Sequence, residues 1–511
     1  MPRKIYTILL LLSLLCCARC FAKSTSIYLL QTTDIHAVLT KEEPDSGSWL
    51  KLASIISETR NNYGAGNCIL VDCGDTIQGT LIGAISKGAA ATIPLKTLAY
   101  DAWIPGNHEF DFGFPRFLEL TEPLRNIILC GNLIPLQAAP FPAWKMFHRD
   151  GARIALIGMT ASYLKFWFGE AFGDACQIEF AATSLKRIFP EILPLHPDLI
   201  VLAIHQAWME TKDARNVNEV ADLVQQFPEI DLVLGGHTHR SLPGHKIGPR
   251  TWYVQAGHAA KSLGVVRAIL DTEKHEVTQI TSCLMNIQED TPDCPELRKD
   301  LALWLDKAEQ AKTQAIAPAP SNDILSKGRP GINCQASDLF CAALAEATGT
   351  SIALHGTLSN KNFSAGKPVT AQDLFDFVPY ENTIVTASLT PAELAEIVLE
   401  QWQNRDSYTY SGIWGIQVRI NPLGNQAEIP ARPDQKDPPD KDLRLQIALN
   451  SFTAAGSGRY PKLKAILKKK ASLTKDTGIS TRDAVRNYLC QHPNLVSNPV
   501  AWLQHEKNAA P

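Results

Sequence analysis

The sequence lacks an excess of charge of either sign, and beyond its first residues it lacks any long apolar run. The formal net charge is −3 over 511 residues, which gives no general attraction to nucleic acid or to anionic membranes. A helix that crosses a bilayer core needs about 20 apolar residues, and no later run reaches that length. We therefore expect no nucleic-acid polymer and no stable membrane anchor among the partners. The oligomeric state stays open.

Cysteines are present without the spacing of a thiolate metal site. Three of the 12 cysteines lie within residues 1–22, and the remaining nine contain no CxxC pair. Because nine is odd, at least one thiol is free or pairs with another molecule. Cys283 and Cys294 lie in a polar connector, and they are the better candidates for a disulfide in an oxidising compartment.

The N-terminal residues have the pattern of a secretory signal. Arg3 and Lys4 precede an apolar run of 13 residues at 5–17, and the small residue Ala22 follows as a point for cleavage. The run is too short to span a membrane as a helix. The sequence predicts that residues 1–22 are removed and that the mature protein is exported to the periplasm or the cell exterior.

Short apolar runs alternate with longer amphipathic stretches from residue 23 to 285. Each run is rich in Val, Ile and Leu, as buried strands are; the runs are IYLLQ, CILV, YDAWI, ARIALIG, DLIVLAI, IDLVL and TWYVQ. Segments between them, such as SWLKLASIISETRNN, have helical character. The alternation predicts an α/β layered domain over residues 23–285.

A second domain is predicted after a helical linker. Residues 296–312 place their apolar side chains on one face with charges opposite, as an amphipathic helix does, and the Pro-punctuated APAPSN follows. We assign residues 286–322 to the linker and 323–511 to the second domain. That domain opens with the helix-like ASDLFCAALAEATG, and it later contains WGIQVRI and LRLQIALNSF, which alternate like strands.

Side chains that can ligate a metal follow five of the apolar runs. Ligand crevices in α/β sheets form beyond the carboxyl ends of the strands, so five such ends can converge in space. The residues are Asp34 and His36 in QTTDIH, Asp75 in VDCGDT, Asn107 in IPGNHE, His205 in VLAIHQ, and His237 and His239 in LGGHTH. Each signal alone is weak, because a histidine after a strand is more often structural. Seven nitrogen and oxygen ligands at strand ends together indicate a metal site.

The ligand types favour a pair of transition ions. Imidazole, carboxylate and carboxamide groups suit Zn, Mn, Fe or Co better than Ca. Seven ligands are too many for one tetrahedral ion but fit two ions, with Asp75 as the bridging carboxylate. Paired ions roughly 3.5–4 Å apart hold the attacking and leaving oxygens in phosphoryl hydrolysis and supply hydroxide at neutral pH. We therefore expect two divalent metal ions and attack by metal hydroxide on a phosphate ester.

The motifs DxH, GDxxxG, GNHE and GHxH, in this order and with a histidine between the last two, resemble those of the calcineurin-like metallophosphoesterases. GNHEFD, GDTIQGT and QAGH narrow the resemblance to the 5′-nucleotidase family, of the bifunctional UDP-sugar hydrolase and 5′-nucleotidase type. It implies a four-layer α/β/β/α metallophosphoesterase domain followed by an α+β 5′-nucleotidase C-terminal domain. By position, it also implies one ion held by Asp34, His36, Asp75 and His239, and a second held by Asp75, Asn107, His205 and His237.

His108 and Asp111 are the catalytic candidates that this resemblance implies. His108 is not a ligand in such sites; it stabilises the transition state or protonates the leaving oxygen. Asp111 would hold the ring of His108 by a hydrogen bond and favour the imidazolium form. The alternative reading of His108 is a residue that only caps the turn. Glu109 is interpreted as structural.

Substrate contacts are expected from the second domain. By resemblance, Tyr380 and Asn382 in VPYENTIV match an aromatic and an asparagine that the family places against a base, and Phe452 in NSFTAAGSGRYP matches the opposing aromatic. Each ring taken alone is more often a core residue. The segment ALHGTLSN lacks the arginine that the family usually has there for phosphate contact. The selectivity for a nucleoside therefore stays open.

The sequence predicts an exported hydrolase of small phosphate esters, with a nucleotide as the expected substrate. A 2′,3′-cyclic nucleotide phosphodiesterase and a UDP-sugar hydrolase are alternatives with the same chemistry. A thiosulfohydrolase would use a similar site on sulfur. A nucleotide-binding protein whose metal site is only structural is the alternative without catalysis.

Overall fold

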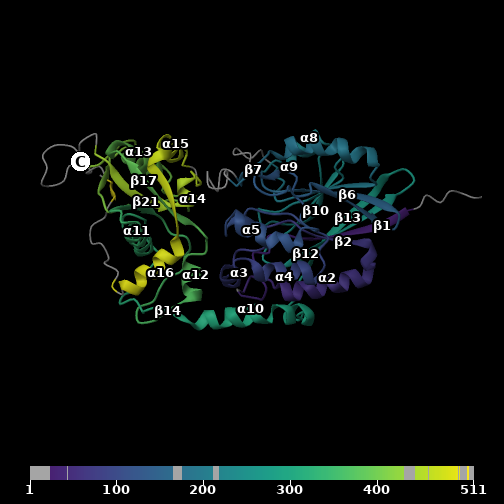
Figure 1. Ribbon diagram of the computed structural model, residues 1–511, viewed down its shortest axis with the longest axis horizontal. Helices are drawn as coiled ribbons and strands as arrows, with labels where there is room; N and C mark the ends of the chain where they lie inside the picture. Colours follow the sequence, from purple (N-terminus) through teal and green to yellow (C-terminus); the bar gives the residue numbers. More distant parts are fainter. Residues whose placement is uncertain are drawn as a thin grey trace, which may run out of the picture.

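A computed structural model of the chain describes residues 24–42, 44–164, 175–210, 218–430, 443–458, 460–492, 494 and 503–505. The predicted signal segment lies outside these residues. Figure 1 shows two lobes, the first domain in purple to teal and the second in green to yellow, with helix α10 running along the lower edge of both.

Two mixed β-sheets lie at the centre of the first domain. The first sheet has the strand order β13-β12-β1-β2-β3 and the second has the order β10-β11-β9-β8-β6-β5. Strands β1, β2 and β3 are parallel, as are β6, β8, β9 and β11, whereas the other neighbours pair antiparallel. The strands are β1 (Ser24–Thr32), β2 (Cys68–Asp72), β3 (Ala102–Trp103), β5 (Trp144–Arg149), β6 (Ala152–Met159), β8 (Leu199–Ile204), β9 (Leu232–Leu234), β10 (Ser241–Ile247), β11 (Thr251–Ala256), β12 (Ser262–Asp271) and β13 (Glu276–Asn286).

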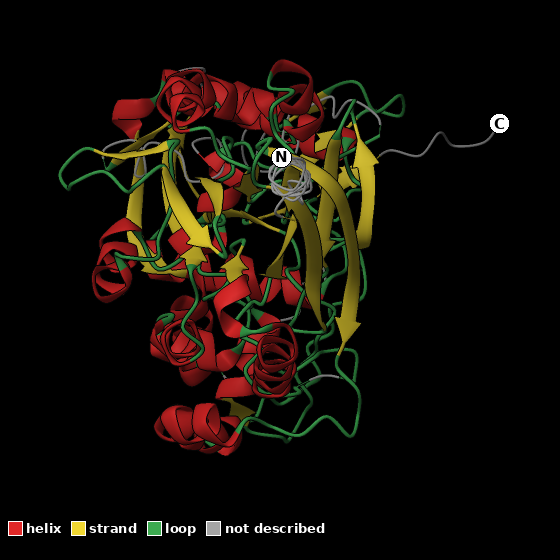
Figure 2. Ribbon diagram, turned by 90° about the vertical axis from the view of Figure 1, so that its right-hand side faces the viewer, coloured by secondary structure: helices red, strands yellow, loops and turns green. Residues whose placement is uncertain are grey.

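Helices cover the outer face of each sheet, so the domain has four layers. Helices above and below enclose the strands in Figure 2. Three separate apolar cores fill the space between the first sheet and its helices, between the two sheets, and between the second sheet and α8 and α9. The helices are α2 (Trp49–Tyr63), α3 (Leu81–Ser86), α4 (Ala89–Thr97), α5 (Phe114–Thr121), α8 (Ala181–Ile192) and α9 (Val220–Gln226). The expected α/β/β/α arrangement is confirmed.

Strand β8 shows why the apolar runs form these strands. All six of its residues, LIVLAI, are buried. Alternate side chains of a strand point to opposite faces; accordingly, its odd-numbered residues belong to the core between the sheets and its even-numbered residues to the core under α8 and α9. A strand covered on both faces reads as a continuous apolar run, which is the pattern that the sequence shows.

The helix predicted at 296–312 is α10 (Pro295–Thr313), and it joins the two domains. It packs on α2, α3 and α4 of the first domain and on α12 (Ala371–Phe377) of the second. Thr97 donates a hydrogen bond to Asp300 of α10 over 2.7 Å, which fixes the helix on the first domain.

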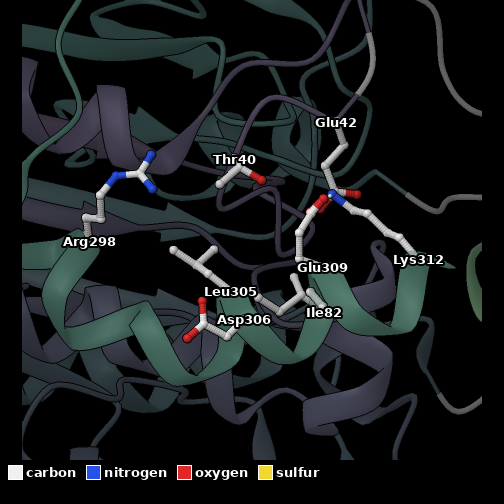
Figure 3. A pocket seen from close by; sticks show the side chains of 9 residues that line it. Thr40, Glu42, Ile82, Arg298, Leu305, Asp306, Glu309 and Lys312 are labelled. Carbon is white, nitrogen blue, oxygen red and sulfur yellow. Dashed lines mark hydrogen bonds and ion pairs between the residues drawn. The ribbon is translucent and has the colours of Figure 1, made fainter. Parts of the chain in front are cut away.

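A groove of about 230 Å³ lies beside α10 (Figure 3). Its lining carries charges of both signs, and Lys312 pairs with Glu309 over 3.1 Å. The lining residues are Thr40, Glu42, Ile82, Arg298, Leu305, Asp306, Ala308, Glu309 and Lys312. None of them belongs to the predicted metal-ligand set.

The second domain is built on a five-stranded sheet with helices against it. The strand order is β18-β15-β21-β17-β22. The strands are β15 (Ile352–His355), β17 (Thr383–Leu389), β18 (Gly412–Trp414), β21 (Leu445–Asn450) and β22 (Thr474–Ser480). The remaining helices are α11 (Gln335–Thr348), α13 (Pro391–Gln403), α14 (Ser451–Ala454), α15 (Pro461–Lys469) and α16 (Thr481–Gln491). Short strands complete the structure: β4 (Leu133–Pro135) with β7 (Cys176–Ile178), β14 (Ala315–Ala317) with β16 (Val369–Thr370), and β19 (Val418–Ile420) with β20 (Ala427–Glu428) and β23 (Leu503–His505).

The structure does not pair the two cysteines expected to form a disulfide. Cys283 lies exposed on β13 and Cys294 precedes α10, and both are free thiols. The polar sequence around them suggested a surface connector, but Cys283 belongs to the edge strand β13, which pairs with β12. Among the described residues, no helix combines the length and the apolar character that a membrane crossing requires.

Candidate metal centre

The seven predicted ligands meet at one edge shared by both sheets. Strands β1, β2 and β3 of the first sheet and β8 and β9 of the second each end just before one or two of them. Parallel strands place their carboxyl ends at the same edge, and the two sheets face each other across one core. Residues far apart in the chain therefore lie side by side.

Two groups of three side chains have ligand atoms within 4.8 Å of one another. One contains Asp34, His36 and His239, and the other contains Asp75, His205 and His237. Nε2 of His36 lies 2.9 Å from Nε2 of His239. Nδ1 of His237 lies 3.0 Å from Oδ1 of Asn107, which brings the carboxamide to the second group.

Nε2 of His205 is buried without a hydrogen bond of good geometry, although it lies 3.1 Å from a carboxylate oxygen of Asp75. The other ring nitrogen, Nδ1, lies 2.7 Å from the carbonyl oxygen of Cys73. His36 is held in the same way, with Nδ1 2.9 Å from the carbonyl oxygen of Gln78. An imidazole that donates from Nδ1 to a carbonyl presents the Nε2 lone pair to a metal. This donor set fits divalent cations.

The ionisation of the cluster also suits cation binding. Burial lowers the pKa of His36 and of His237 to about 3 and that of His239 to about 4, so these imidazoles are neutral. Burial raises the pKa of Asp34 to about 7. Burial opposes charge on His205 too, but the neighbouring Asp75 carboxylate outweighs it and raises the pKa to about 9. A cation bound there would replace that proton, because a ligand must be deprotonated.

Five of the seven predicted ligands have a left-handed backbone. Their φ angles are 52° at Asp34, 55° at His36, 55° at Asp75, 75° at His237 and 58° at His239. Residues with a Cβ atom rarely adopt this region, and the strain persists only where surrounding contacts enforce it. Hydrogen bonds between the strand ends provide those contacts, from Asp34 N to Gly74 O and from His36 N to Asp75 O, each 2.8 Å.

Gly106, the glycine of the GNHE motif, lies where no side chain would fit. A Cβ atom at this position would lie 2.3 Å from Oδ1 of Asp75 and 2.8 Å from Cε1 of His205. The backbone of the third strand end can approach the two ligands only because the residue has no side chain.

His108 and Asp111 form the predicted pair. Nδ1 of His108 lies 2.7 Å from Oδ2 of Asp111, and its backbone N–H donates to Oδ1 of Asp75 over 2.7 Å. Burial lowers the pKa of His108, but Asp111 and Asp75 outweigh burial and raise it to about 10. A ring nitrogen of His108 also lies within 4.8 Å of ligand atoms of His36 and Asp75. The imidazole is therefore protonated and faces the cluster.

Glu109 has a larger part in the site than its sequence position indicated. Its fully buried carboxylate accepts from four backbone N–H groups: Asp75 at 2.8 Å, Gly106 at 2.5 Å, Thr76 at 2.6 Å and Ile77 at 3.3 Å. It thereby ties the loop after β2 to the loop after β3. The structural role expected for Glu109 is thus a specific one, since it fixes the position of Asp75.

His258, in the motif QAGH, is a further histidine near the site, for which the sequence admits a support role beside a purely structural one. Its ring stacks on that of His239, with centroids 4.8 Å apart, and Nδ1 lies 3.3 Å from the carbonyl oxygen of His239. His245 lies elsewhere, edge-on to Trp208 at 4.7 Å.

The second-domain candidates lie at one end of its sheet, with Tyr380 and Asn382 in the loop before β17 and Phe452 in the short helix α14 after β21. Tyr380 is 44% exposed and Phe452 is 37% exposed, so neither ring belongs to the core. Asn382 accepts a hydrogen bond from Thr481 through its carbonyl oxygen, over 2.9 Å. The loop that carries Tyr380 reaches the first domain, because Gln78 donates to Pro379 O over 2.8 Å.

Comparisons with known proteins agree with this geometry. Two family models match the chain: calcineurin-like phosphoesterase over residues 27–241 and 5′-nucleotidase, C-terminal domain, over residues 313–465. The chain is 23% identical over 523 residues to protein UshA of Yersinia enterocolitica, an alignment that covers 93% of this chain and 92% of that protein.

Solved structures share the fold. A 5′-nucleotidase precursor from Thermus thermophilus matches with a TM-score of 0.66 at 19% identity, over 95% of this chain and 100% of that one. The sulfate thiohydrolase SoxB from the same species, in complex with glycerol, matches with a TM-score of 0.60 at 16% identity, over 94% and 96%. At such identities the likeness concerns the fold alone.

Replacing Glu109 with glutamine should weaken both the fold and the metal centre. The amide –NH2 would face backbone donors that now bind a carboxylate oxygen, and unsatisfied buried donors cost about 1–3 kcal/mol each. We expect the free energy of unfolding of the metal-free protein to fall by about 2–3 kcal/mol, and cation affinity to fall about 10–100-fold. Urea unfolding and calorimetric metal titration measure the two quantities.

Glu119→Gln is the matched control, because this side chain is 66% exposed and pairs with Arg116 on the surface. It should leave both quantities nearly unchanged. A Glu109→Gln protein as stable and as metal-avid as the parent would contradict the bridging role of this carboxylate.

Proposed function

Because the chain belongs to the calcineurin-like phosphoesterases that carry a 5′-nucleotidase C-terminal domain, we propose that it is an exported enzyme that hydrolyses nucleotide phosphate esters at a centre of two divalent cations. The predicted family and fold are confirmed, and the members of this family are hydrolases that act on phosphate esters. The substrate, the cation pair and the export are the parts that we propose.

One observation carries the proposal most directly. Two imidazoles, His36 and His205, each have a ring nitrogen within 4.8 Å of a carboxylate oxygen of Asp75, while a backbone carbonyl holds Nδ1 of each. Nε2 of His205 is buried without a hydrogen bond of good geometry, whereas a histidine that served only the core would use both nitrogens, because a buried unsatisfied nitrogen is costly. Cations are the partners that complete this arrangement.

We assign one cation to Asp34, His36, Asp75 and His239, and the other to Asp75, Asn107, His205 and His237. Such ions, when bound, activate water and neutralise charge on a phosphoryl group. The ligand types admit Zn, Mn, Fe or Co. Asp75 is the shared ligand in this assignment, and its backbone N–H is held by Glu109.

His108 supplies the proton to the leaving oxygen in our proposal. Asp111 holds Nδ1 and keeps the ring charged, so the other nitrogen is left to donate. The positive ring also stabilises the charge that develops on the phosphoryl oxygens. Bound dications would lower the pKa of His108 toward neutral pH, where a general acid is most effective.

His108→Ala should lose most of kcat and keep the metals. General acid catalysis contributes about 10²–10⁴-fold, and we expect a loss in that range at unchanged metal content. Steady-state kinetics with elemental analysis of the same sample tests this. Asp111→Asn should lose less, because the acid remains but is poorly oriented. Turnover near that of the parent in His108→Ala would refute the assignment.

The second domain supports a substrate with an aromatic base. In our proposal the exposed rings of Tyr380 and Phe452 stack on the base and Asn382 lies beside it, as the family resemblance implies. No arginine stands in the segment after β15, and His355 at the end of that strand is buried. Burial lowers the pKa of His355 to about 4, so it brings no positive charge to a phosphate. In our proposal, charge recognition therefore falls to the cations and to His108.

Tyr380→Ala and Phe452→Ala should each raise KM for a nucleotide by about fivefold to 100-fold, since a base–aromatic stack contributes about 1–3 kcal/mol. KM for glycerol 2-phosphate, which has no base, should stay the same. Tyr63→Ala, an exposed tyrosine of the first domain, is the control. Equal effects on both substrates would contradict the stacking role.

A substrate panel before and after chelation tests the function as a whole. We expect phosphate release from AMP or ATP that disappears on metal removal and returns with Mn²⁺. Turnover of only 2′,3′-cyclic AMP or only UDP-glucose would move the assignment to those activities. Cleavage of sulfate from a cysteine-bound carrier without phosphoester turnover would favour a thiosulfohydrolase, the activity named for one structural neighbour. Metal binding without any turnover would favour a nucleotide-binding protein whose metal site is only structural.

A further inference from the structure

Gln78 touches both the metal cluster and the second domain. It lies three residues after Asp75, in the loop between β2 and α3, and is 2% exposed. Its carbonyl oxygen lies 2.9 Å from Nδ1 of His36. Its side-chain Nε2 donates to Pro379 O of the second domain over 2.8 Å. One residue thus orients a predicted metal ligand through its backbone and reaches the other domain through its side chain.

The loop around Gln78 packs against His36 without freedom to move. Gly79 has a φ of 144°, and a Cβ atom there would lie 2.6 Å from Cβ of His36. The glycine lets the chain pass directly over the histidine. Any displacement of Gln78 therefore bears on His36.

The loop that accepts the hydrogen bond from Gln78 is also held by residues of its own domain. Arg482 donates from Nε to Val378 O over 2.8 Å and forms an ion pair with Glu381 over 2.7 Å. Both charged side chains are largely buried, at 16% and 15% exposed. Thr481 N–H donates to Asn382 O over 2.9 Å. The segment 378–382 is therefore a rigid unit, which carries Tyr380 and Asn382.

A small apolar cluster supports the same junction. Leu81 of α3, Ala311 of α10 and Phe375 of α12 pack together, and the guanidinium of Arg482 lies 5.0 Å from the ring of Phe375. Figure 1 shows α3 and α12 at the facing sides of the two lobes. The hydrogen bond from Gln78 to Pro379 O is partly buried and joins the same two domains as this cluster.

We infer that Gln78 is a positioning residue that holds the base-recognition loop 378–382 in register with the metal centre. The inference rests on the proposed function, because the loop is assigned to the base of a nucleotide. The side chain of Gln78 fixes where Tyr380 stands relative to the cluster, while its backbone keeps His36 in place. Substitution of the side chain should affect recognition of the base and spare the cations.

Gln78→Met tests this, because methionine has a similar size and no donor. We expect KM for the best nucleotide of the panel to rise about tenfold, the effect of losing one partly buried hydrogen bond. Metal content should stay that of the parent, because the backbone carbonyl that holds Nδ1 of His36 is retained, and KM for glycerol 2-phosphate should change by less than about twofold. Gln177→Met, at an exposed glutamine of β7, is the matched control. Losses on both substrates together with loss of metal would overturn the inference.

Hydrogen exchange of the metal-free protein gives a second readout, independent of turnover. Peptides that cover residues 378–384 should exchange faster in Gln78→Met than in the parent or in Gln177→Met. Arg482→Gln, which removes the hydrogen bond to Val378 O and the ion pair with Glu381, should reproduce the faster exchange. Unchanged exchange in Gln78→Met would overturn the inference. A parent enzyme that hydrolyses no nucleotide would refute the proposed function instead. The exchange result would still decide whether Gln78 holds the loop 378–382 against the first domain.

Discussion

Buried charge at the edge shared by two sheets is the constraint on which the rest of the site depends. Asp34 and Asp75 are 0% and 1% exposed, and burying an isolated carboxylate costs several kcal/mol even after relaxation, on the order of the net stability of a domain. Asp75 is compensated by the imidazole of His205 at 3.1 Å and by the N–H of His108 at 2.7 Å. Such compensation is partial in the metal-free protein, which is why cations belong to the proposal.

The backbone is strained in the same place. Left-handed residues with side chains are uncommon, yet Asp34, Asp75 and His237 all adopt this conformation. The hydrogen bonds between strand ends and the carboxylate of Glu109 hold them there. Strain of this kind persists only in a rigid surrounding, and the three apolar cores of the first domain provide one. The packing of the first domain thus offsets this strain, and the atoms of the predicted ligands are in position before any substrate binds.

In the proposed function, the chemistry and the recognition lie in different domains. Every predicted ligand, together with His108 and Asp111, lies in the first domain, whereas the exposed rings of Tyr380 and Phe452 lie in the second. On this proposal hydrolysis can tolerate change in the second domain, and selectivity can vary while the metal centre stays constant. The segment at the end of β15, which has no arginine and where His355 is buried, is one such variation. The junction at Gln78 and Pro379 joins the two roles.

The sequence by itself determined the layered fold and which side chains to propose as metal ligands, because both follow from local patterns. Continuous apolar runs such as LIVLAI mark strands buried on two faces, and the metal-competent residues stand directly after them. The sequence could not predict the hydrogen bonds of Glu109, the stacking of His258 on His239 or the absence of a Cys283–Cys294 disulfide. These depend on distances between segments far apart in the chain. Only the packing of one sheet on the other decides them, as it decides that Gln78 meets Pro379.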